Sequence, residues 1–356
     1  NLGVSTIALS LGCSKYFVFC KVAFARKQQF WKSDIGIILL FKWSLIMVEH
    51  TLIPNTYYLS IGSHPPVLHI DSGDRVITKT ADAGGKDFED KVVSGRGNPQ
   101  TGPIYVNGAK PGDVLAVTFE KIIPNRNYGF CRPKVAPNVL NPEHSSGLSS
   151  EEIFHFNIDL KAGTAEIDKN SGYTRSLIVP LRPMIGCFGV APDRGQAIST
   201  ATSGPYGGNM DYLGFREGVT AYLPVFVEGG LFHIGDGHAW QSDGEILGTG
   251  IEISMDVEFT LTLVKGTAIS WPRGENDKYI FTAGNARPLD EAVQHSTSEM
   301  LNWLQDCYGM NEKDANILLG MYVKYDVGNI FDPAYTMICK LPKEVLPSEE
   351  KKFLLG

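Results

Sequence analysis

Apolar and polar side chains alternate strictly over residues 255–264, and this pattern constrains the fold more than any other feature of the chain. Side chains in a β-strand point to opposite faces with a period of two, so such a run buries one face and leaves the other in water. The pattern therefore predicts a strand of an antiparallel sheet. The apolar members are Val257, Phe259, Leu261 and Leu263, and the polar members are Asp256, Glu258, Thr260 and Thr262.

Short apolar runs separated by turn residues dominate the rest of the chain, and residues 67–70, 76–78 and 114–119 are predicted strands. The 38 glycines and 20 prolines are spread along the chain, as expected of many tight reversals. Helical spacing appears only late, and predicts one helix from Pro288 to about Leu304 and a second from Asn311 to about Gly320. We therefore expect a mainly β fold of short antiparallel strands with a small helical C-terminal part.

Charge and cysteine content exclude several classes of function. The net charge is −7, which disfavours a nucleic-acid or anionic-membrane surface because such partners need a concentrated positive field. No two cysteines form a CxxC pair, so a four-cysteine zinc site and a disulfide framework are both disfavoured, and a reducing, cytoplasmic location is predicted. The six cysteines are Cys13, Cys20, Cys131, Cys187, Cys307 and Cys339.

The first 46 residues differ in character from the rest. The chain begins with Asn1, and lysines interrupt the apolar runs 2–24 and 35–48, so neither run reaches the roughly 18–20 residues that span a bilayer. We interpret residues 1–46 as an extension outside the fold, with a signal or membrane anchor as the alternative. We expect residues 47–356, which begin at Met47, to form one domain.

The densest combination of polar residues and glycines runs from Gly235 to Glu252. If residues 236–238 are extended, Asp236 and His238 point to the same side and can share a divalent ion, and a mixed oxygen and nitrogen set suits zinc or a similar metal. The segment follows an apolar stretch, so we expect it to leave the sheet and enter a loop or cleft. Asp-Gly pairs are also common turn formers, so a purely structural role stays open.

Three further segments could carry chemistry. Asn209 and Asp211 lie in a glycine-rich segment that could present an amide and a carboxylate, although a plain β-turn is the alternative. Asp82 ends a predicted strand. Cys187 could be a nucleophile, but its apolar setting disfavours the thiolate. No GxSxG elbow, Walker loop or GxGxxG opening a helix is present.

Four separated motifs resemble, in the same order, those of the acetamidase/formamidase family, and the likeness covers roughly Val48 to Leu346. The family implies a β-sandwich-like fold, hydrolysis of short aliphatic amides such as formamide and acetamide to the acid and ammonia, and a homo-oligomer. The entry region 51–66 and His233 depart from the family pattern, which puts substrate size in doubt. The motifs are residues 98–113, 183–192, 207–211 and 235–245.

The resemblance implies a metal-dependent amidase. Our hypothesis gives the metal, zinc or another divalent ion, to Asp82, Asp211, Asp236 and His238. Glu252 is assigned as general base, because burial of a carboxylate in an apolar strand raises its pKa and suits it to proton exchange, and a plain strand-edge glutamate is the alternative. Asn209 and Gln241 bind the amide substrate or its oxyanion. Two alternatives stay open: a catalytically inactive β-sandwich that binds a small ligand or metal, and a cysteine-dependent amidase that uses Cys187.

Overall fold

The alternating segment forms β18 (Met255–Val264), whose side chains are buried at every second position as predicted. The computed structural model describes residues 47–144 and 152–347, so the predictions for residues 1–46 lie outside the described residues. β18 lies between β4 and β6 in a nine-stranded sheet, mostly antiparallel. In spatial order its strands are β1 (Glu49–Leu52), β4 (Asp74–Lys79), β18, β6 (Val114–Pro124), β15 (Thr220–Pro224), β19 (Arg273–Glu275), β20 (Tyr279–Ala286), β22 (Tyr335–Pro342) and β21 (Lys324–Asn329).

A second, eleven-stranded sheet carries the predicted polar segments. Its main path is β10 (Ile178–Pro180), β9 (Thr164–Ile167), β8 (Phe154–Asp159), β7 (Tyr128–Cys131), β17 (Glu252–Ile253), β16 (Phe232–His238), β11 (Met184–Val190), β14 (Gly207–Asn209) and β13 (Ser203–Gly204). β5 (Gln100–Val106) pairs with β16, and β3 (Leu68–Ile70) pairs with β5. A small separate pair joins β12 (Ala197–Ser199) to β2 (Ser60–Gly62).

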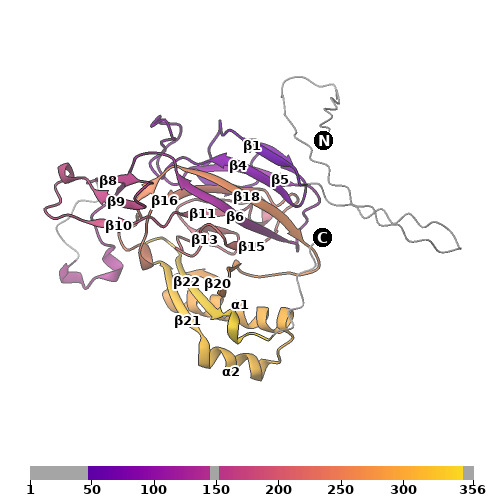
Figure 1. Ribbon diagram of the computed structural model, residues 1–356. Helices are drawn as coiled ribbons and strands as arrows, with labels where there is room; N and C mark the ends of the chain where they lie inside the picture. The colour runs from indigo at the N-terminus through magenta and orange to yellow at the C-terminus, as the bar shows by residue number, and fades with distance from the viewer. Residues whose placement is uncertain (1–46, 145–151, 348–356) are drawn as a thin grey trace, which may run out of the picture.

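The main hydrophobic core lies between the two large sheets. Phe119 of β6 packs edge to face against Phe188 of β11, with 5.2 Å between the ring centroids. Phe259 of β18 packs against Phe232 of β16 with a centroid distance of 5.4 Å. Each contact joins one sheet to the other, as in a β-sandwich, where the inner faces of two sheets interdigitate. Figure 1 shows these strands crossing in the upper body of the molecule. The predicted mainly β class is confirmed.

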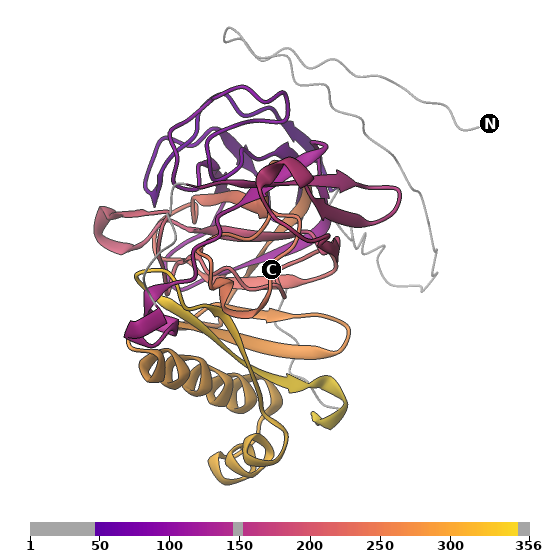
Figure 2. The same ribbon diagram turned by 90° about the vertical axis from the view of Figure 1, so that its left-hand side faces the viewer.

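The helical part lies at the C-terminal end, below the sheets in Figures 1 and 2. Helix α1 (Leu289–Tyr308) contacts β20 and β22, and Trp303, Met300 and Leu304 form a second core there. Helix α2 (Glu312–Tyr322) begins as predicted after Asn311, whose side chain accepts from the Asp314 amide at 2.9 Å. Neither helix is both long and apolar enough to cross a membrane.

Strand β16 corrects one expectation about the polar segment that begins at Gly235. The segment from Gly235 was expected to leave the sheet, but β16 continues through His238, and the chain leaves the sheet only after that residue. Glycines 235 and 237 allow this because their lack of a side chain lets neighbouring groups approach β16 closely. The short 3-10 helices are η1 (Pro137–Val139), η2 (Pro142–His144), η3 (Lys169–Ser171), η4 (Asp193–Gly195), η5 (Asp243–Glu245) and η6 (Lys343–Val345).

Candidate metal centre

Three of the four predicted metal ligands converge over one glycine. Gly186 lies in β11, opposite the part of β16 that carries Asp236 and His238. A Cβ atom placed on Gly186 would lie 2.3 Å from Asp211 Oδ1, 2.7 Å from Asp236 Oδ2 and 3.2 Å from His238 Cε1. Only a residue without a side chain leaves room for these three groups to meet.

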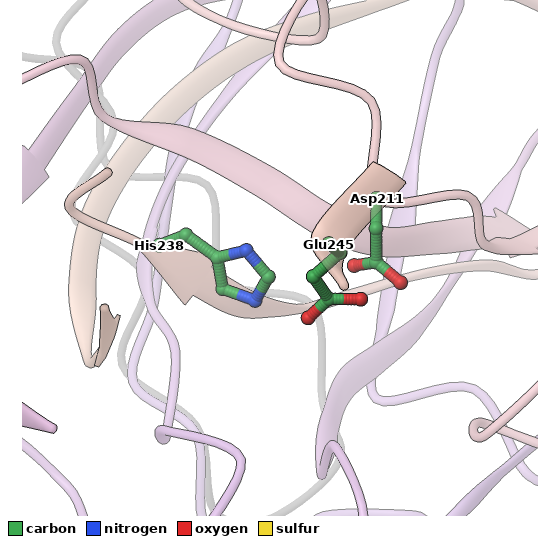
Figure 3. A group of neighbouring side chains, drawn as sticks. All are labelled: Asp211, His238 and Glu245. Atoms are coloured by element: carbon green, nitrogen blue, oxygen red, sulfur yellow. The ribbon is translucent and has the colours of Figure 1, made fainter. Parts of the chain in front are cut away.

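Two overlapping groups of ligand atoms share His238. One consists of Asp211, His238 and Glu245, and the other of Asp236, His238 and Glu252, with the ligand atoms of each group within 4.8 Å of one another. Figure 3 shows the imidazole of His238 and the carboxylates of Glu245 and Asp211 in the first group. In the second group, His238 Nε2 lies 3.2 Å from Glu252 Oε1 and 3.5 Å from Asp236 Oδ1. All five residues are buried.

A hydrogen bond determines which nitrogen of His238 faces the carboxylates. Gln241 Nε2 donates to the backbone oxygens of Asp211 and Gly328, so its Oε1 is the atom that accepts from His238 Nδ1, at 2.8 Å. His238 Nδ1 therefore carries a hydrogen, and Nε2 is directed at the acids. Metal-bound histidines are commonly oriented in this way, by a hydrogen bond from the nitrogen that does not bind the ion.

Burial and mutual repulsion raise the pKa values of the carboxyl groups. The pKa of Asp211 rises to about 6, through burial first and then the charge of Asp236. The pKa of Asp236 also rises to about 6, again mainly through burial. Burial and neighbouring carboxylates hold the pKa values of Glu245 and Asp332 well above their usual range. A bound cation would relieve this repulsion.

The pKa of His238 responds to the same charges in the opposite sense. Burial lowers it, but the carboxylates of Glu252 and Asp236 raise it more, so the pKa lies well above its usual value. Without a cation, the imidazole is therefore protonated and balances part of the acidic charge. Because a metal ligand must be deprotonated, ion binding at this site would release protons.

Several polar atoms of the cluster are buried without a hydrogen-bond partner in the described part of the chain, and this observation tests whether a cation fits. Unpartnered buried polar atoms are rare in proteins, and an ion is one of the recognised explanations. A nitrogen together with carboxylate oxygens suits zinc and similar divalent ions. The residues present therefore fit a divalent cation. The unpartnered atoms are Asp211 Oδ1, Asp236 Oδ1, His238 Nε2 and Glu252 Oε2.

Backbone strain is concentrated in the same cluster. Seven non-glycine residues of the described chain have positive φ, and Asp211 (43°), Asp236 (59°) and Glu245 (43°) are three of them. Such conformations cost about 1–3 kcal/mol each and occur most often at functional sites. The three carboxylates are thus held in place against the local preference of the backbone.

A C-terminal residue that sequence reasoning missed connects the carboxylates. Asn329, at the end of β21, donates from Nδ2 to Asp211 Oδ2 at 2.7 Å, to Glu245 Oε2 at 2.9 Å and to Asp332 Oδ2 at 2.9 Å. Glu245 lies in the motif 235–245 but is not among the ligands predicted from sequence. Nothing in the local sequence around Asn329 indicates its contacts, because its partners lie up to 118 residues away.

The predicted substrate-binding residues are occupied by contacts within the protein. Asn209 donates to Asp332 Oδ2 at 2.6 Å and accepts from Asn98 Nδ2 at 2.8 Å. Gln241 makes the three hydrogen bonds to His238, Asp211 and Gly328 described above. Both side chains are buried beside the cluster.

Asp82 belongs to neither ligand group. Its carboxylate is buried, receives Arg126 Nη2 as an ion pair, and accepts from the backbone amide of Lys86 at 2.9 Å. Both oxygens are therefore engaged by donors.

Cys187 and His233 lie on strands β11 and β16 but are deeply buried. Burial, followed by the charges of nearby carboxylates, raises the pKa of the Cys187 thiol well above its usual value, which disfavours a nucleophilic thiolate. Burial lowers the pKa of His233 to about 3, so this side chain is neutral. His233 meets His64 of the entry region edge to face at 5.8 Å.

Comparison with known proteins identifies relatives along most of the chain. The model of the acetamidase/formamidase family matches residues 50–197 and 194–347. The solved acetamidase of Yersinia enterocolitica is 34% identical with a TM-score of 0.73, over 85% of this chain and 94% of that one. The solved acetamidase of Bacillus halodurans is 30% identical with a TM-score of 0.70, over 83% and 98%.

Curated relatives match over shorter stretches. A Schizosaccharomyces pombe protein to which formamidase activity is ascribed is 26% identical over 210 residues, which is 46% of this chain and 51% of that protein. The acetamidase of Mycolicibacterium smegmatis is 38% identical over 84 residues, which is 23% of this chain and 20% of that protein. The chain thus spans about half, or less, of the curated relatives that it matches.

Proposed function

We propose that this chain, which belongs to the acetamidase/formamidase family, hydrolyses short aliphatic amides such as formamide and acetamide to the carboxylic acid and ammonia with a divalent cation, zinc. The observation that carries the proposal is the convergence over Gly186 of one imidazole and two carboxylates, of His238, Asp211 and Asp236, each with a buried atom that lacks a hydrogen-bond partner among the described residues. Solved relatives with the name acetamidase support the same reaction.

His238, Asp211, Asp236 and Glu245 would hold the cation. When bound, such an ion polarises the amide carbonyl and lowers the pKa of a water molecule toward neutrality. The set keeps three of the ligands expected from sequence and adds Glu245. It leaves out Asp82, for which the ion pair with Arg126 supports a structural role.

Glu252 is the proposed general base and acid. Its Oε1 accepts from the Gly250 amide at 2.9 Å, which fixes the carboxylate, whereas Oε2 has no partner and can accept a proton from water. The same oxygen can then return that proton to the amide nitrogen, because this nitrogen leaves readily only after protonation, as neutral ammonia. The C–N bond breaks and a C–O bond to the water oxygen forms.

Gln241 and Asn209 are proposed as positioning residues in place of the substrate contact expected from sequence. Gln241 holds the His238 ring in the orientation that directs Nε2 at the acids. Asn209 holds Asp332, which in turn accepts from Asn329. Hydrogen bonds of this second layer are typically needed for full metal affinity. The homo-oligomer and the cytoplasmic location stay predictions.

Ammonia release tests this function. We expect the purified chain to release ammonia from formamide, acetamide and propionamide, to stop after exhaustive chelation, and to recover when zinc is returned. Activity that survives chelation but is lost with iodoacetamide would support Cys187 chemistry instead. No release from any of the three amides with zinc bound would favour the inactive, ligand-binding alternative.

A further inference from the structure

A cavity of about 200 Å³ is lined in part by residues that are close in the chain to Glu245 and Asp332, two members of the acid cluster formed by Asp211, Asp236, His238, Glu245, Glu252 and Asp332. The segment 132–138 forms one side of it and the loop 244–250 the other. Two hydrogen bonds join these walls, from the Arg132 amide to Thr249 Oγ1 at 3.0 Å and from the Ala136 amide to the Ile246 oxygen at 2.7 Å. The lining residues are Arg132, Lys134, Val135, Pro137, Leu247 and Phe331.

The cavity borders the most exposed part of the cluster. Leu247 follows Glu245 by two residues, and Phe331 directly precedes Asp332. Glu245 and Asp332 are 5% and 8% exposed, whereas Asp211, Asp236, His238 and Glu252 are at most 1% exposed. The cluster therefore comes nearest to the surface on the side of the cavity, which makes this side the natural approach for a substrate.

The lining combines two cations with an apolar wall. Val135, Leu247 and Phe331 offer apolar contact, and Arg132 and Lys134 offer positive charge. Within residues 47–144 and 152–347, no carboxylate forms an ion pair with Lys134. Glu245 of the acid cluster belongs to the loop 244–250, so one wall of the cavity carries the two cations and the opposite wall belongs to a loop that carries an acid. A ligand with one anionic end and one neutral end would be oriented by this charge difference.

We infer that the cavity binds the acyl end of the substrate and that the preferred substrates are short amides whose acyl chain ends in a carboxylate. The carboxylate would pair with Lys134 and Arg132, the methylene groups would lie against Phe331 and Leu247, and the neutral amide would face the acid cluster. This inference rests on the proposed function. In this reaction, water hydrolyses the monoamide of a dicarboxylic acid to the dicarboxylate and ammonium.

The test compares succinamate, the monoamide of succinic acid, with acetamide. We expect the wild-type chain to show a ratio of kcat/KM for succinamate to that for acetamide of about ten or more, since charge-assisted contacts are strong. Lys134→Gln should lower this ratio about tenfold and Lys134→Glu further. Lys161→Gln is the matched control, because Lys161 is an exposed lysine in the turn between β8 and β9.

Binding of succinate is measured by calorimetry on the same zinc-loaded proteins. It distinguishes failure of the proposed amidase function from failure of the anion-binding cavity. We expect Lys134→Glu to weaken it about tenfold or more and Lys161→Gln to leave it unchanged. If no amide is hydrolysed but succinate binding depends on Lys134, the anion-binding cavity stands and the proposed function fails. If acetamide is hydrolysed while neither the succinamate ratio nor succinate binding depends on Lys134, the proposed function stands and this inference is overturned.

Discussion

Gly186 is the residue whose replacement should affect the candidate centre most directly. In Gly186→Ala, the new methyl group would lie 2.3 Å from Asp211 Oδ1 and 2.7 Å from Asp236 Oδ2, so at least one carboxylate must move. We expect zinc content and ammonia release to fall at least tenfold, because ligand geometry determines affinity. Zinc is measured by elemental analysis of the purified protein.

The matched control is Gly320→Ala. Apart from its chain neighbours and the backbone of its own helix, no atom of the described residues lies within 4 Å of a Cβ placed on Gly320, and this residue belongs to helix α2, where alanine is favourable. The control should keep its zinc and its activity. A Gly186→Ala protein with full zinc content would contradict the position of the ion over this glycine.

A substitution at Glu252 distinguishes a role in proton transfer from a role in metal binding. Glu252→Gln keeps the size of the side chain and removes its basicity, so turnover should fall at least 100-fold, the lower end of what general acid–base catalysis contributes. Zinc content should be unchanged. Glu228→Gln, an exposed glutamate, is the control. Retained turnover would contradict the assignment of Glu252 as general base. Loss of zinc would indicate that Glu252 is a metal ligand instead.

At the scale of elements, the sequence predicts what depends on local pattern. The alternation in β18, the cap at Asn311 and the start of α1 are properties of a few adjacent residues, so they could be predicted from sequence. Asp211, Asp236 and His238 could be selected from the sequence as candidate metal ligands, because each lies in a glycine-rich motif. The contacts of Asn329 were not, since they depend on how β21 lies against segments more than 80 residues away.

The attachment of α1 to its sheet depends on a buried ion pair. Arg273 Nε of β19 donates to Glu299 Oε1 of α1 at 2.6 Å, and both side chains are about 1% exposed. Glu299→Ala leaves Arg273 buried without this partner, so we expect the free energy of unfolding to fall by about 3–5 kcal/mol. Urea denaturation measures the change.

A double variant shows whether the charge itself is the cause. Arg273→Met combined with Glu299→Leu removes both charges and keeps apolar volume, so it should be clearly more stable than Glu299→Ala alone. An equal loss in the two proteins would mean that packing, rather than the uncompensated arginine, explains the destabilisation.

For the whole molecule, the raised pKa values predict how stability changes with pH. Asp211 and Asp236 titrate at about 6 in the folded chain, against 3.8 as the ordinary value. The folded chain therefore binds more protons than the unfolded chain between these values, so stability is present at low pH and is lost as pH rises through about 6. The raised pKa of His238 acts in the same direction.

The measurement is thermal unfolding of the zinc-free protein at pH 5 and pH 8. We expect a lower Tm at pH 8, with a contribution of about 1.4 kcal/mol from each carboxyl group, since pH 5 lies about one pKa unit below the folded-state value and one unit corresponds to about 1.4 kcal/mol. The variant Asp211→Asn with Asp236→Asn should show a weaker dependence. Zinc should stabilise the native protein most at pH 8, because its ligands are deprotonated there. A Tm that rises from pH 5 to pH 8 without zinc would contradict the pKa assignments.

The extent of the functional unit is also a whole-molecule question. Family similarity begins at residue 50, and the start of the enzyme at Met47 stays a prediction. A protein of residues 47–356 should therefore release ammonia from acetamide at the rate of the full chain. A truncated protein that folds but is inactive would show that residues 1–46 contribute to the site.

The positive φ angles of Asp211, Asp236 and Glu245 carry a consequence for how this protein would respond to laboratory evolution. Glycine adopts such angles freely, so replacing any of the three by glycine would relieve strain and remove a buried carboxylate together. Both changes favour the zinc-free fold. A library selected for heat resistance in the absence of zinc should thus accumulate substitutions at these positions first, and its most heat-resistant members should be those that no longer bind the ion.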